Sequence, residues 1–228
     1  MTDKLVFYTH PMSRARIVRW MLEEVGEPYE TKVLEFGHSM KGPDYLAINP
    51  MGKVPALRHG ETVVTEAAAI CAYLADAFPA AGLAPPSGSR ERGPYYRWLF
   101  FGAGPVEAAV MDKALGFEIP VEREGMVGYG NIERALAAVE GALYRTEYVA
   151  GDQFTAADVY VGSQIGWGMM YRGIDKRPAF ERYWALLSAR PAYIRAKAID
   201  DQIIEERKKA GRLSMPRYII PQPTCEPT

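Results

Sequence analysis

Cysteine and histidine are scarce in this chain of 228 residues, which contains two cysteines and three histidines. The cysteines, Cys71 and Cys225, lie far apart and match no spacing of a metal-binding motif. We therefore expect neither a disulfide framework nor a metal site. This usage of cysteine is typical of proteins that work in a reducing compartment.

Long apolar runs and an excess of one charge are also missing. No apolar stretch approaches the roughly 20 residues that span a bilayer, and Met1–Lys4 lack the charged-then-apolar order of a signal peptide. The 27 Lys and Arg residues nearly balance the 28 Asp and Glu residues, for a net charge of -1. Such a chain has no global attraction to nucleic acid or acidic membranes. We expect a cytoplasmic globular protein without nucleic-acid or membrane partners.

The first third of the chain alternates between strand and helix patterns. Apolar residues at spacings of three and four predict an amphipathic helix over 14–25, which Gly26 ends. Strand-like runs flank it, and strand, helix, strand within some thirty residues favours parallel pairing. Two more predicted helices and two more predicted strands follow. The predicted order of elements in the first domain is therefore βαβ-α-ββα. The predicted strands are 5–8, 29–34, 54–57 and 62–64, and the other helices are 42–48 and 66–78.

A segment rich in Pro, Gly and Ser follows, and no convincing strand pattern appears after it. Pro105 should kink or divide the first of the helices beyond it. These helices are predicted at about 91–116, 125–147, 155–171, 178–189 and 191–210. The predicted organisation is a first domain over 1–80, a linker over 81–90, and an all-helical domain over 91–228 with an extended, proline-rich tail from about 212.

The strongest single motif is the run from Asn49 to Leu57, which reads NPMGKVPAL. Only about 5–6% of X-Pro bonds in folded proteins are cis, but this loop leads into a hairpin after a βαβ unit. We predict a cis bond between Val54 and Pro55, which turns the N–H and C=O of Val54 outward. These groups can then pair with an extended peptide, as in strand addition.

A second motif runs from Val64 to Ile70, where a helix begins directly after a strand. The free N–H groups and the positive dipole end of such a helix attract a carboxylate. Glu66 in the first turn can also serve as a purely structural partner of the dipole. Further along, Gly151 to Asp158 form a G-x-x-x-T-x-A-D string, in which Thr155 and Asp158 are spaced as a capping box.

Together these motifs resemble the glutathione transferases, over about residues 4 to 200. The resemblance is to the cytosolic bacterial type, with the class left open between beta-like and theta-like. It implies a thioredoxin-like N-terminal domain followed by an all-helical C-terminal domain, with glutathione as co-substrate. It also implies that Val54 pairs with the cysteinyl backbone, that Lys53 lies near the glycyl end, and that Glu66 and Ala67 bind the γ-glutamyl group.

Ala67 departs from the family, which usually has Ser at this position. Its backbone N–H can still bind the γ-glutamyl carboxylate, but the hydroxyl hydrogen bond is lost. This loss costs about 1–2 kcal/mol unless a neighbour such as Thr65 or a water replaces it.

Members of this family activate the glutathione thiol with a Tyr, Ser or Cys after the first strand. Counted without gaps from Tyr8, Ser13 falls where the beta-class enzymes carry their cysteine, so we predict Ser13 as the catalytic residue and Tyr8 as the runner-up. Ser13 is also suited to cap the following helix, and both roles can hold. Tyr8 is expected in the strand core, and His10 is expected to be an exposed loop residue.

The resemblance thus implies a transferase that adds the glutathione thiolate to a small electrophilic, partly apolar acceptor, in detoxification and as a homodimer. Candidate residues for lining the acceptor site between the domains are Met12, Tyr95, Trp98, Phe101 and Tyr171. One alternative is a glutathione-dependent disulfide or peroxide reductase, against which the lack of cysteine at position 13 argues. Another is a non-catalytic binding or scaffold protein, which Ala67 leaves open.

Overall fold

The computed structural model describes residues 3–212 and places a four-stranded sheet in the first third of the chain. The strands are β1 (Leu5–Thr9), β2 (Tyr29–Val33), β3 (Ala56–His59) and β4 (Thr62–Thr65), in the order β2-β1-β3-β4. As the βαβ pattern predicts, β1 and β2 are parallel, whereas β3 pairs antiparallel with both β1 and β4. This is the thioredoxin-like arrangement expected from the sequence.

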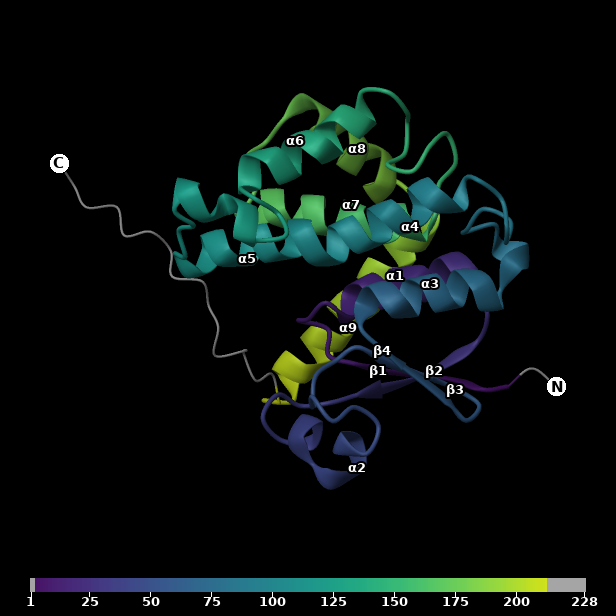
Figure 1. Ribbon diagram of the computed structural model, residues 1–228. Coiled ribbons are helices and arrows are strands. Elements are labelled where there is room, and N and C mark those ends of the chain that lie inside the picture. The colour runs from purple at the N-terminus through teal and green to yellow at the C-terminus, as the bar shows by residue number, and fades with distance from the viewer. Residues whose placement is uncertain (1–2, 213–228) are drawn as a thin grey trace.

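Helices lie on both faces of the sheet (Figure 1). α1 (Ala15–Val25) and α3 (Ala67–Ala77) cover one face, and α2 (Pro43–Leu46), preceded by the 3-10 turn η1 (Ser39–Lys41), lies on the other. Side chains alternate along β1, so that Leu5 and Phe7 join the core under α1 and α3, while Val6 and Tyr8 join a smaller cluster toward α2. α1 ends at Gly26, which adopts a φ of 79° and donates its N–H to the carbonyl of Leu22.

Only helices follow β4 within the described residues. After the 3-10 turn η2 (Pro79–Ala81), the helices are α4 (Arg92–Phe101), the π-helical turn η3 (Gly102–Val106), α5 (Glu107–Leu115), the 3-10 segment η4 (Val121–Met126), α6 (Ile132–Leu143), α7 (Ala156–Met170), α8 (Pro178–Ser188) and α9 (Pro191–Lys209). Pro105, expected to kink or divide a helix, lies inside η3, where α4 passes into α5.

The helix expected over 125–147 begins later than predicted, at Ile132. Gly130 has a φ of 66°, which interrupts the helical backbone. Asn131 then caps α6, because its side-chain oxygen accepts a hydrogen bond from the N–H of Arg134 at 2.9 Å. The expected tail and Cys225 lie outside the described residues. Among residues 3–212, no helix combines the length and apolarity needed to cross a membrane.

α7 is the central helix of the second part and is buried along most of its length. The predicted capping box is present at its start, with Thr155 as the N-cap and Asp158 bonding back to it. Asp158 also accepts hydrogen bonds from Val149 N–H and the Tyr183 hydroxyl. Burial raises the pKa of Asp158 to about 6, although these hydrogen bonds lower it.

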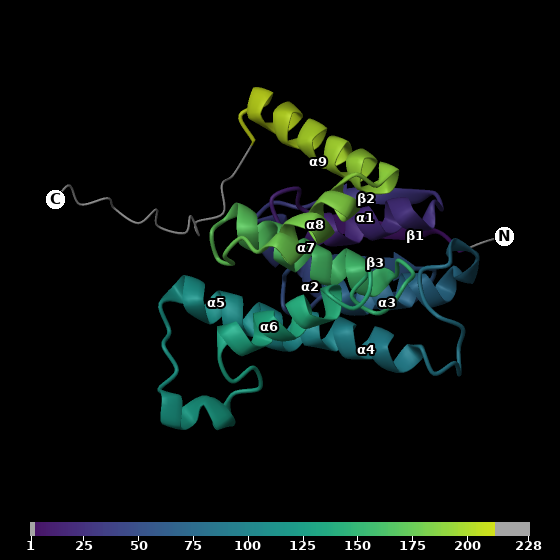
Figure 2. The ribbon, with the colours of Figure 1, turned by 90° about the horizontal axis from the view of Figure 1, so that it is seen from above.

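α9 returns to the sheet and runs beside α1, as Figures 1 and 2 show from two directions. Two consecutive aspartates of α9 bind two arginines of α1: Asp200 pairs with Arg19, and Asp201 pairs with Arg16. The Arg19–Asp200 pair is buried, with both side chains 1% exposed. The last helix therefore fixes α1, and with it the loop that precedes α1.

Candidate functional site

The register of the sheet brings the predicted site residues to one edge. Tyr8 of β1 lies opposite Ala56 of β3, and Ala56 lies opposite Thr65 of β4. One row across the sheet therefore joins the end of β1, the start of β3 and the end of β4. The loop with Ser13, the Val54–Pro55 segment and the start of α3 all continue from this row.

The loop that leads into β3 is held by hydrogen bonds from a side chain of α2 and from a side chain of the loop itself. The carbonyl of Lys53 accepts hydrogen bonds from the Tyr45 hydroxyl at 2.6 Å and from the Asn49 amide at 2.8 Å. The Val54–Pro55 bond is cis, as predicted. Val54 is half-buried, and within residues 3–212 neither its N–H nor its C=O takes part in a hydrogen bond. Its peptide N–H and C=O are therefore unpaired in this part of the chain.

The start of α3 presents free backbone donors beside a carboxylate. Glu66 is the N-cap residue, with φ 66° and ψ 121°, a conformation that residues other than glycine rarely adopt. The Ala67 N–H has no acceptor among the described residues, as expected for the first turn of a helix. Glu66 is exposed and Ala67 is 8% exposed. Backbone strain of this kind is found most often at functional sites.

Ser13 occupies the turn that leads into α1. Its Oγ accepts a hydrogen bond from the Ala15 N–H at 3.1 Å and donates its proton to the carbonyl of His10 at 2.7 Å. Ser13 therefore bonds to the first N–H of α1, as a capping residue would, although Arg14 rather than Ser13 occupies the N-cap position. To donate to a ligand sulfur, the Ser13 hydroxyl must turn away from the His10 carbonyl, which is a rotation about one bond.

Tyr8 is a buried strand residue, as predicted, with 8% of its surface exposed. Its ring packs in the cluster toward α2, 5.6 Å from the ring of Tyr45. Its hydroxyl has no hydrogen-bond partner in the part of the chain that the structure describes. Because Ala15 and Ala67 belong to the core on the opposite face, Tyr8 points away from the starts of α1 and α3.

His10 is not the exposed loop residue that we expected. Its side chain is fully buried, with its ring centroid 4.0 Å from that of Phe36. Its Nδ1 accepts the Met12 N–H at 3.2 Å, so the neutral ring carries its proton on Nε2, which has no partner among residues 3–212. Burial, and secondarily the charge of Arg207, lower the pKa of His10 to about 4.

This burial predicts a loss of stability in acid. The folded protein resists protonating His10 until about pH 4, whereas an unfolded chain binds that proton near pH 6.5. The contribution of the neutral His10 ring to the free energy of unfolding is therefore complete above pH 6.5 and is lost as the pH falls to 4. We expect wild type to lose up to about 3 kcal/mol of unfolding free energy relative to His10→Gln over this window.

Urea unfolding at several pH values measures this difference. His38→Gln is the matched control, because His38 is exposed, and its pH profile should follow wild type. Parallel profiles for wild type and His10→Gln would show that the buried ring does not resist protonation.

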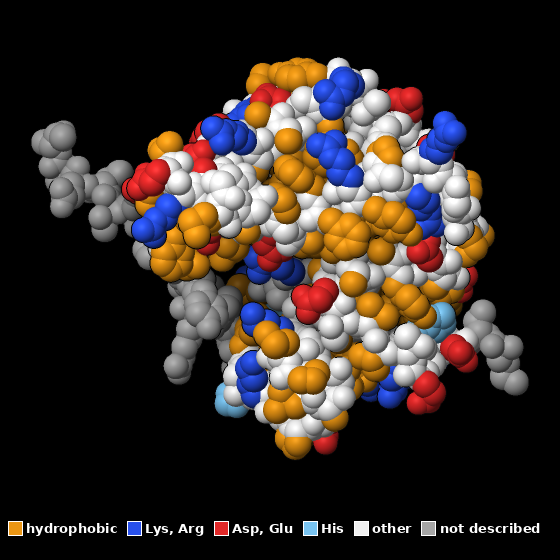
Figure 3. Space-filling view, in the orientation of Figure 1, with side chains coloured by type: hydrophobic (Ala, Val, Ile, Leu, Met, Phe, Trp, Pro, Cys, Tyr) orange, Lys and Arg blue, Asp and Glu red, His pale blue; other side chains and the backbone are white. Residues whose placement is uncertain are grey.

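The residues expected to line an acceptor site divide into two groups. Tyr95 and Trp98 are wrong as lining residues, because they are 0% and 3% exposed and belong to the helical core. Met12 and Phe101 are partly exposed, and Tyr171 is 66% exposed. Figure 3 shows a hollow between the helical part and the sheet part, with charged side chains near its rim.

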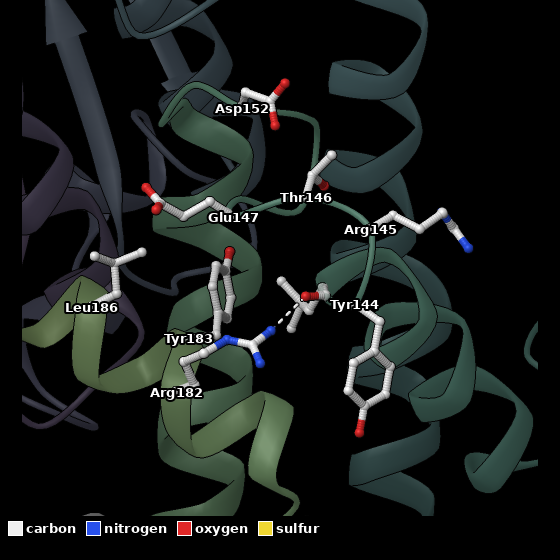
Figure 4. Close-up of a pocket in the computed structure, with 9 residues that line it drawn as sticks. Tyr144, Arg145, Thr146, Glu147, Asp152, Arg182, Tyr183 and Leu186 are labelled. Atoms are coloured by element: carbon white, nitrogen blue, oxygen red, sulfur yellow. Dashed lines mark hydrogen bonds between the residues drawn. The ribbon is translucent and has the colours of Figure 1, made fainter.

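A separate cavity of about 490 Å³ lies in the helical part, where the connection between α6 and α7 meets α8 (Figure 4). Its walls are mostly exposed and mix charges of both signs, with Arg145 and Arg182 opposite Glu147 and Asp152. Arg182 donates a hydrogen bond to the Leu143 carbonyl at 2.6 Å. None of the predicted site residues lines this cavity.

Comparisons with known proteins agree with the two-part fold. Models of the glutathione S-transferase N-terminal and C-terminal domains match residues 11–77 and 122–191. A glutathione S-transferase of Xanthomonas campestris is 29% identical over 167 residues, which cover 67% of this chain and 79% of the relative.

Two solved structures are also similar. A glutathione transferase of Methylococcus capsulatus has a TM-score of 0.70 and 31% identity, covering 87% of this chain and 99% of its own. A sphingomonad glutathione S-transferase complexed with glutathione has a TM-score of 0.70 and 31% identity, covering 86% of this chain and 98% of its own. The chain belongs to the glutathione S-transferase family.

Proposed function

We propose that this protein is a glutathione transferase that binds glutathione along the sheet edge. The observation that carries the proposal is the row of Tyr8, Ala56 and Thr65, which places the Ser13 loop, Val54 and Glu66 together. The free peptide groups of Val54 pair with the cysteinyl backbone of glutathione. The γ-glutamyl carboxylate accepts the Ala67 N–H at the positive end of α3.

Charged side chains at the edge suit the two ends of the tripeptide. The carboxylate of Glu66 faces the γ-glutamyl ammonium group, and the exposed Lys53 attracts the glycyl carboxylate. Ser13 donates its hydroxyl proton to the glutathione sulfur and so stabilises the thiolate, which is the nucleophile. Ser13 Oγ bonds to the Ala15 N–H at the start of α1, whereas the Tyr8 ring packs in the cluster toward α2, which favours Ser13 over Tyr8 as this donor.

The proposal includes a small electrophilic acceptor, held between the sheet part and the helices. It also includes work in the cytoplasm, in detoxification of such electrophiles. Retention on immobilised glutathione together with turnover of an aryl halide tests the activity. Retention without turnover would favour a non-catalytic binding protein, and failure of both would refute the proposal. Activity confined to a membrane or secreted fraction would contradict the location.

We further propose a homodimer. Exposed apolar side chains occur on both parts of the chain, at Met51 and Val63 in the sheet part and at Tyr96 and Phe100 in α4. In the aromatic-rich segment 95–101, Tyr96 and Phe100 are exposed, whereas Tyr95 and Trp98 are buried. A single monomeric species in sedimentation would contradict this assembly.

Glu66→Ala is expected to weaken glutathione binding about tenfold, since a hydrogen bond to a charged group contributes about 1.5–3 kcal/mol when buried and less at an exposed site. The rate at saturating glutathione should change less than about twofold, because the carboxylate is far from the sulfur end of the tripeptide. Lys53→Ala should also weaken glutathione binding, by a smaller factor, and this loss of affinity should decrease with added salt.

Calorimetric titration with glutathione measures these affinities. The matched control is Glu61→Ala, which removes an exposed carboxylate in the turn between β3 and β4 and should leave affinity unchanged. Wild-type affinity in Glu66→Ala, or an equal loss in Glu61→Ala, would place the γ-glutamyl group elsewhere.

A further inference from the structure

Arg14 connects the Ser13 loop to the helical part of the protein. It follows Ser13 directly, and its Nε lies 2.9 Å from Oε1 of Glu107, the first residue of α5. The Arg14 side chain is 43% exposed. Within residues 3–212, neither of its two terminal guanidinium nitrogens donates a hydrogen bond. These nitrogens are available donors beside the residue that we assign to the sulfur.

Glu107 is itself held firmly from α7. Its second oxygen, Oε2, accepts the Tyr160 hydroxyl proton at 2.7 Å and the Gln164 amide at 3.3 Å. Tyr160 and Gln164 are 3% and 8% exposed. Just before Glu107, the π-helical turn packs closely on α7, where a Cβ at Gly102 would lie 2.9 Å from Val161 Cγ2. Both carboxylate oxygens are thus engaged, and Glu107 fixes Arg14 from the helical side.

The other arginine of this turn, Arg16, is bound within the loop and to α9. Arg16 donates from Nε to the Pro11 carbonyl at 2.7 Å and pairs with Asp201 of α9. Arg16 therefore supports the loop from the side of α9, whereas Arg14 contacts α5. Because Glu107 belongs to α5, this contact places the Arg14 guanidinium where the Ser13 loop faces the helical part.

We propose that Arg14 binds an oxygen of the electrophilic acceptor and that the preferred acceptors are α,β-unsaturated carbonyl compounds. This inference rests on the proposed transferase function and names its substrate class. A guanidinium presents paired N–H donors that suit carbonyl and carboxylate oxygens. Glu107 is the positioning residue, since it acts only through Arg14.

In the proposed reaction, the N–H groups of Arg14 stabilise a negative charge that develops on the acceptor oxygen. The sulfur of the glutathione thiolate forms a bond to the β-carbon, and the electron pair of the C=C bond moves to give an enolate with its charge on oxygen. Arg14 N–H groups stabilise this oxygen as the charge develops. The proton that the thiol releases to solvent is replaced by a solvent proton on the α-carbon, so no group leaves and no oxidant is needed.

The test compares two acceptors of similar size on the full-length protein, an α,β-unsaturated ketone and a benzyl halide without oxygen. Arg14→Gln should lower kcat/KM for the ketone about ten- to thirtyfold and for the halide less than about twofold, with the KM for glutathione unchanged. Lys113→Gln is the control for charge, because Lys113 is an exposed lysine of α5, and it should match wild type with both acceptors.

Glu107 variants separate positioning from folding. Glu107→Ala should reproduce part of the loss with the ketone while leaving the halide rate and the glutathione KM unchanged, and Glu107→Asp should restore part of the ketone rate. Equal losses with both acceptors in Arg14→Gln, or no loss with either, would overturn the inference. A wild type that turns over the halide but not the ketone would refute only this inference, whereas one that turns over neither would refute the proposed function.

Discussion

Arg19→Met is expected to lower the free energy of unfolding by about 3–5 kcal/mol, because it leaves the Asp200 carboxylate buried without its partner. Arg19 Nε donates to Asp200 Oδ1 at 2.8 Å, and its Nη1 donates to the Tyr29 hydroxyl at 3.1 Å. The guanidinium also lies over the Phe7 ring, 5.1 Å from its centroid. Burial raises the pKa of Asp200, and the charge of Arg19 opposes that rise.

Urea unfolding of wild type and variants measures this loss. The double variant Arg19→Met with Asp200→Leu should recover most of it, since replacing both charges removes the burial penalty. Arg195→Met is the matched control: Arg195 also joins α9 to α1, through Glu23 at 3.1 Å, but is 55% exposed and should cost less than about 1 kcal/mol. Equal losses in Arg19→Met and Arg195→Met would contradict a buried, interdependent pair.

Ser13→Ala is expected to lower kcat about a hundredfold while leaving the KM for glutathione nearly unchanged. The hydroxyl favours thiolate over thiol, and a shift of two units in the pKa of bound glutathione corresponds to about 2.7 kcal/mol. The peptide itself is held by other groups, so its affinity should be preserved. Steady-state kinetics, with the thiolate absorbance titrated against pH, measure both effects.

Loss of the Ala15 contact will also cost Ser13→Ala some stability, about 1 kcal/mol for a helix cap. Ser39→Ala controls for this cost, because the Ser39 hydroxyl accepts the Glu35 N–H at 2.8 Å outside the proposed site. It should lose stability without losing turnover. Full activity in Ser13→Ala together with a large loss in Tyr8→Phe would assign the thiolate to Tyr8 and leave Ser13 as a cap alone.

Features set by local sequence were predicted well. The apolar spacing of α1, the glycine that ends it, and the Thr155 capping box each depend on residues within a few positions of one another. The strand order also made it predictable that the Ser13 loop, Val54 and Glu66 lie at the same end of the sheet. The late start of α6 was missed, since Gly130 and Asn131 outweigh the helical pattern around them.

Contacts between distant segments could not be predicted in this way. Asp200 lies 181 residues after Arg19, and nothing near either residue indicates the other. The His10 ring packs on Phe36, in the segment after β2, and its lowered pKa also reflects the charge of Arg207 at the end of α9. Glu107 reads as an ordinary acidic residue in the first turn of a helix until the fold brings Arg14 beside it.

A crystal structure of the protein with glutathione bound tests the central claim most directly. We expect the cysteinyl backbone to pair with Val54, the γ-glutamyl group to lie at Glu66 and Ala67, and the sulfur to lie within about 3.5 Å of the Ser13 hydroxyl, turned from the His10 carbonyl. A sulfur bonded to the Tyr8 hydroxyl instead, or a tripeptide bound away from this sheet edge, would contradict the account.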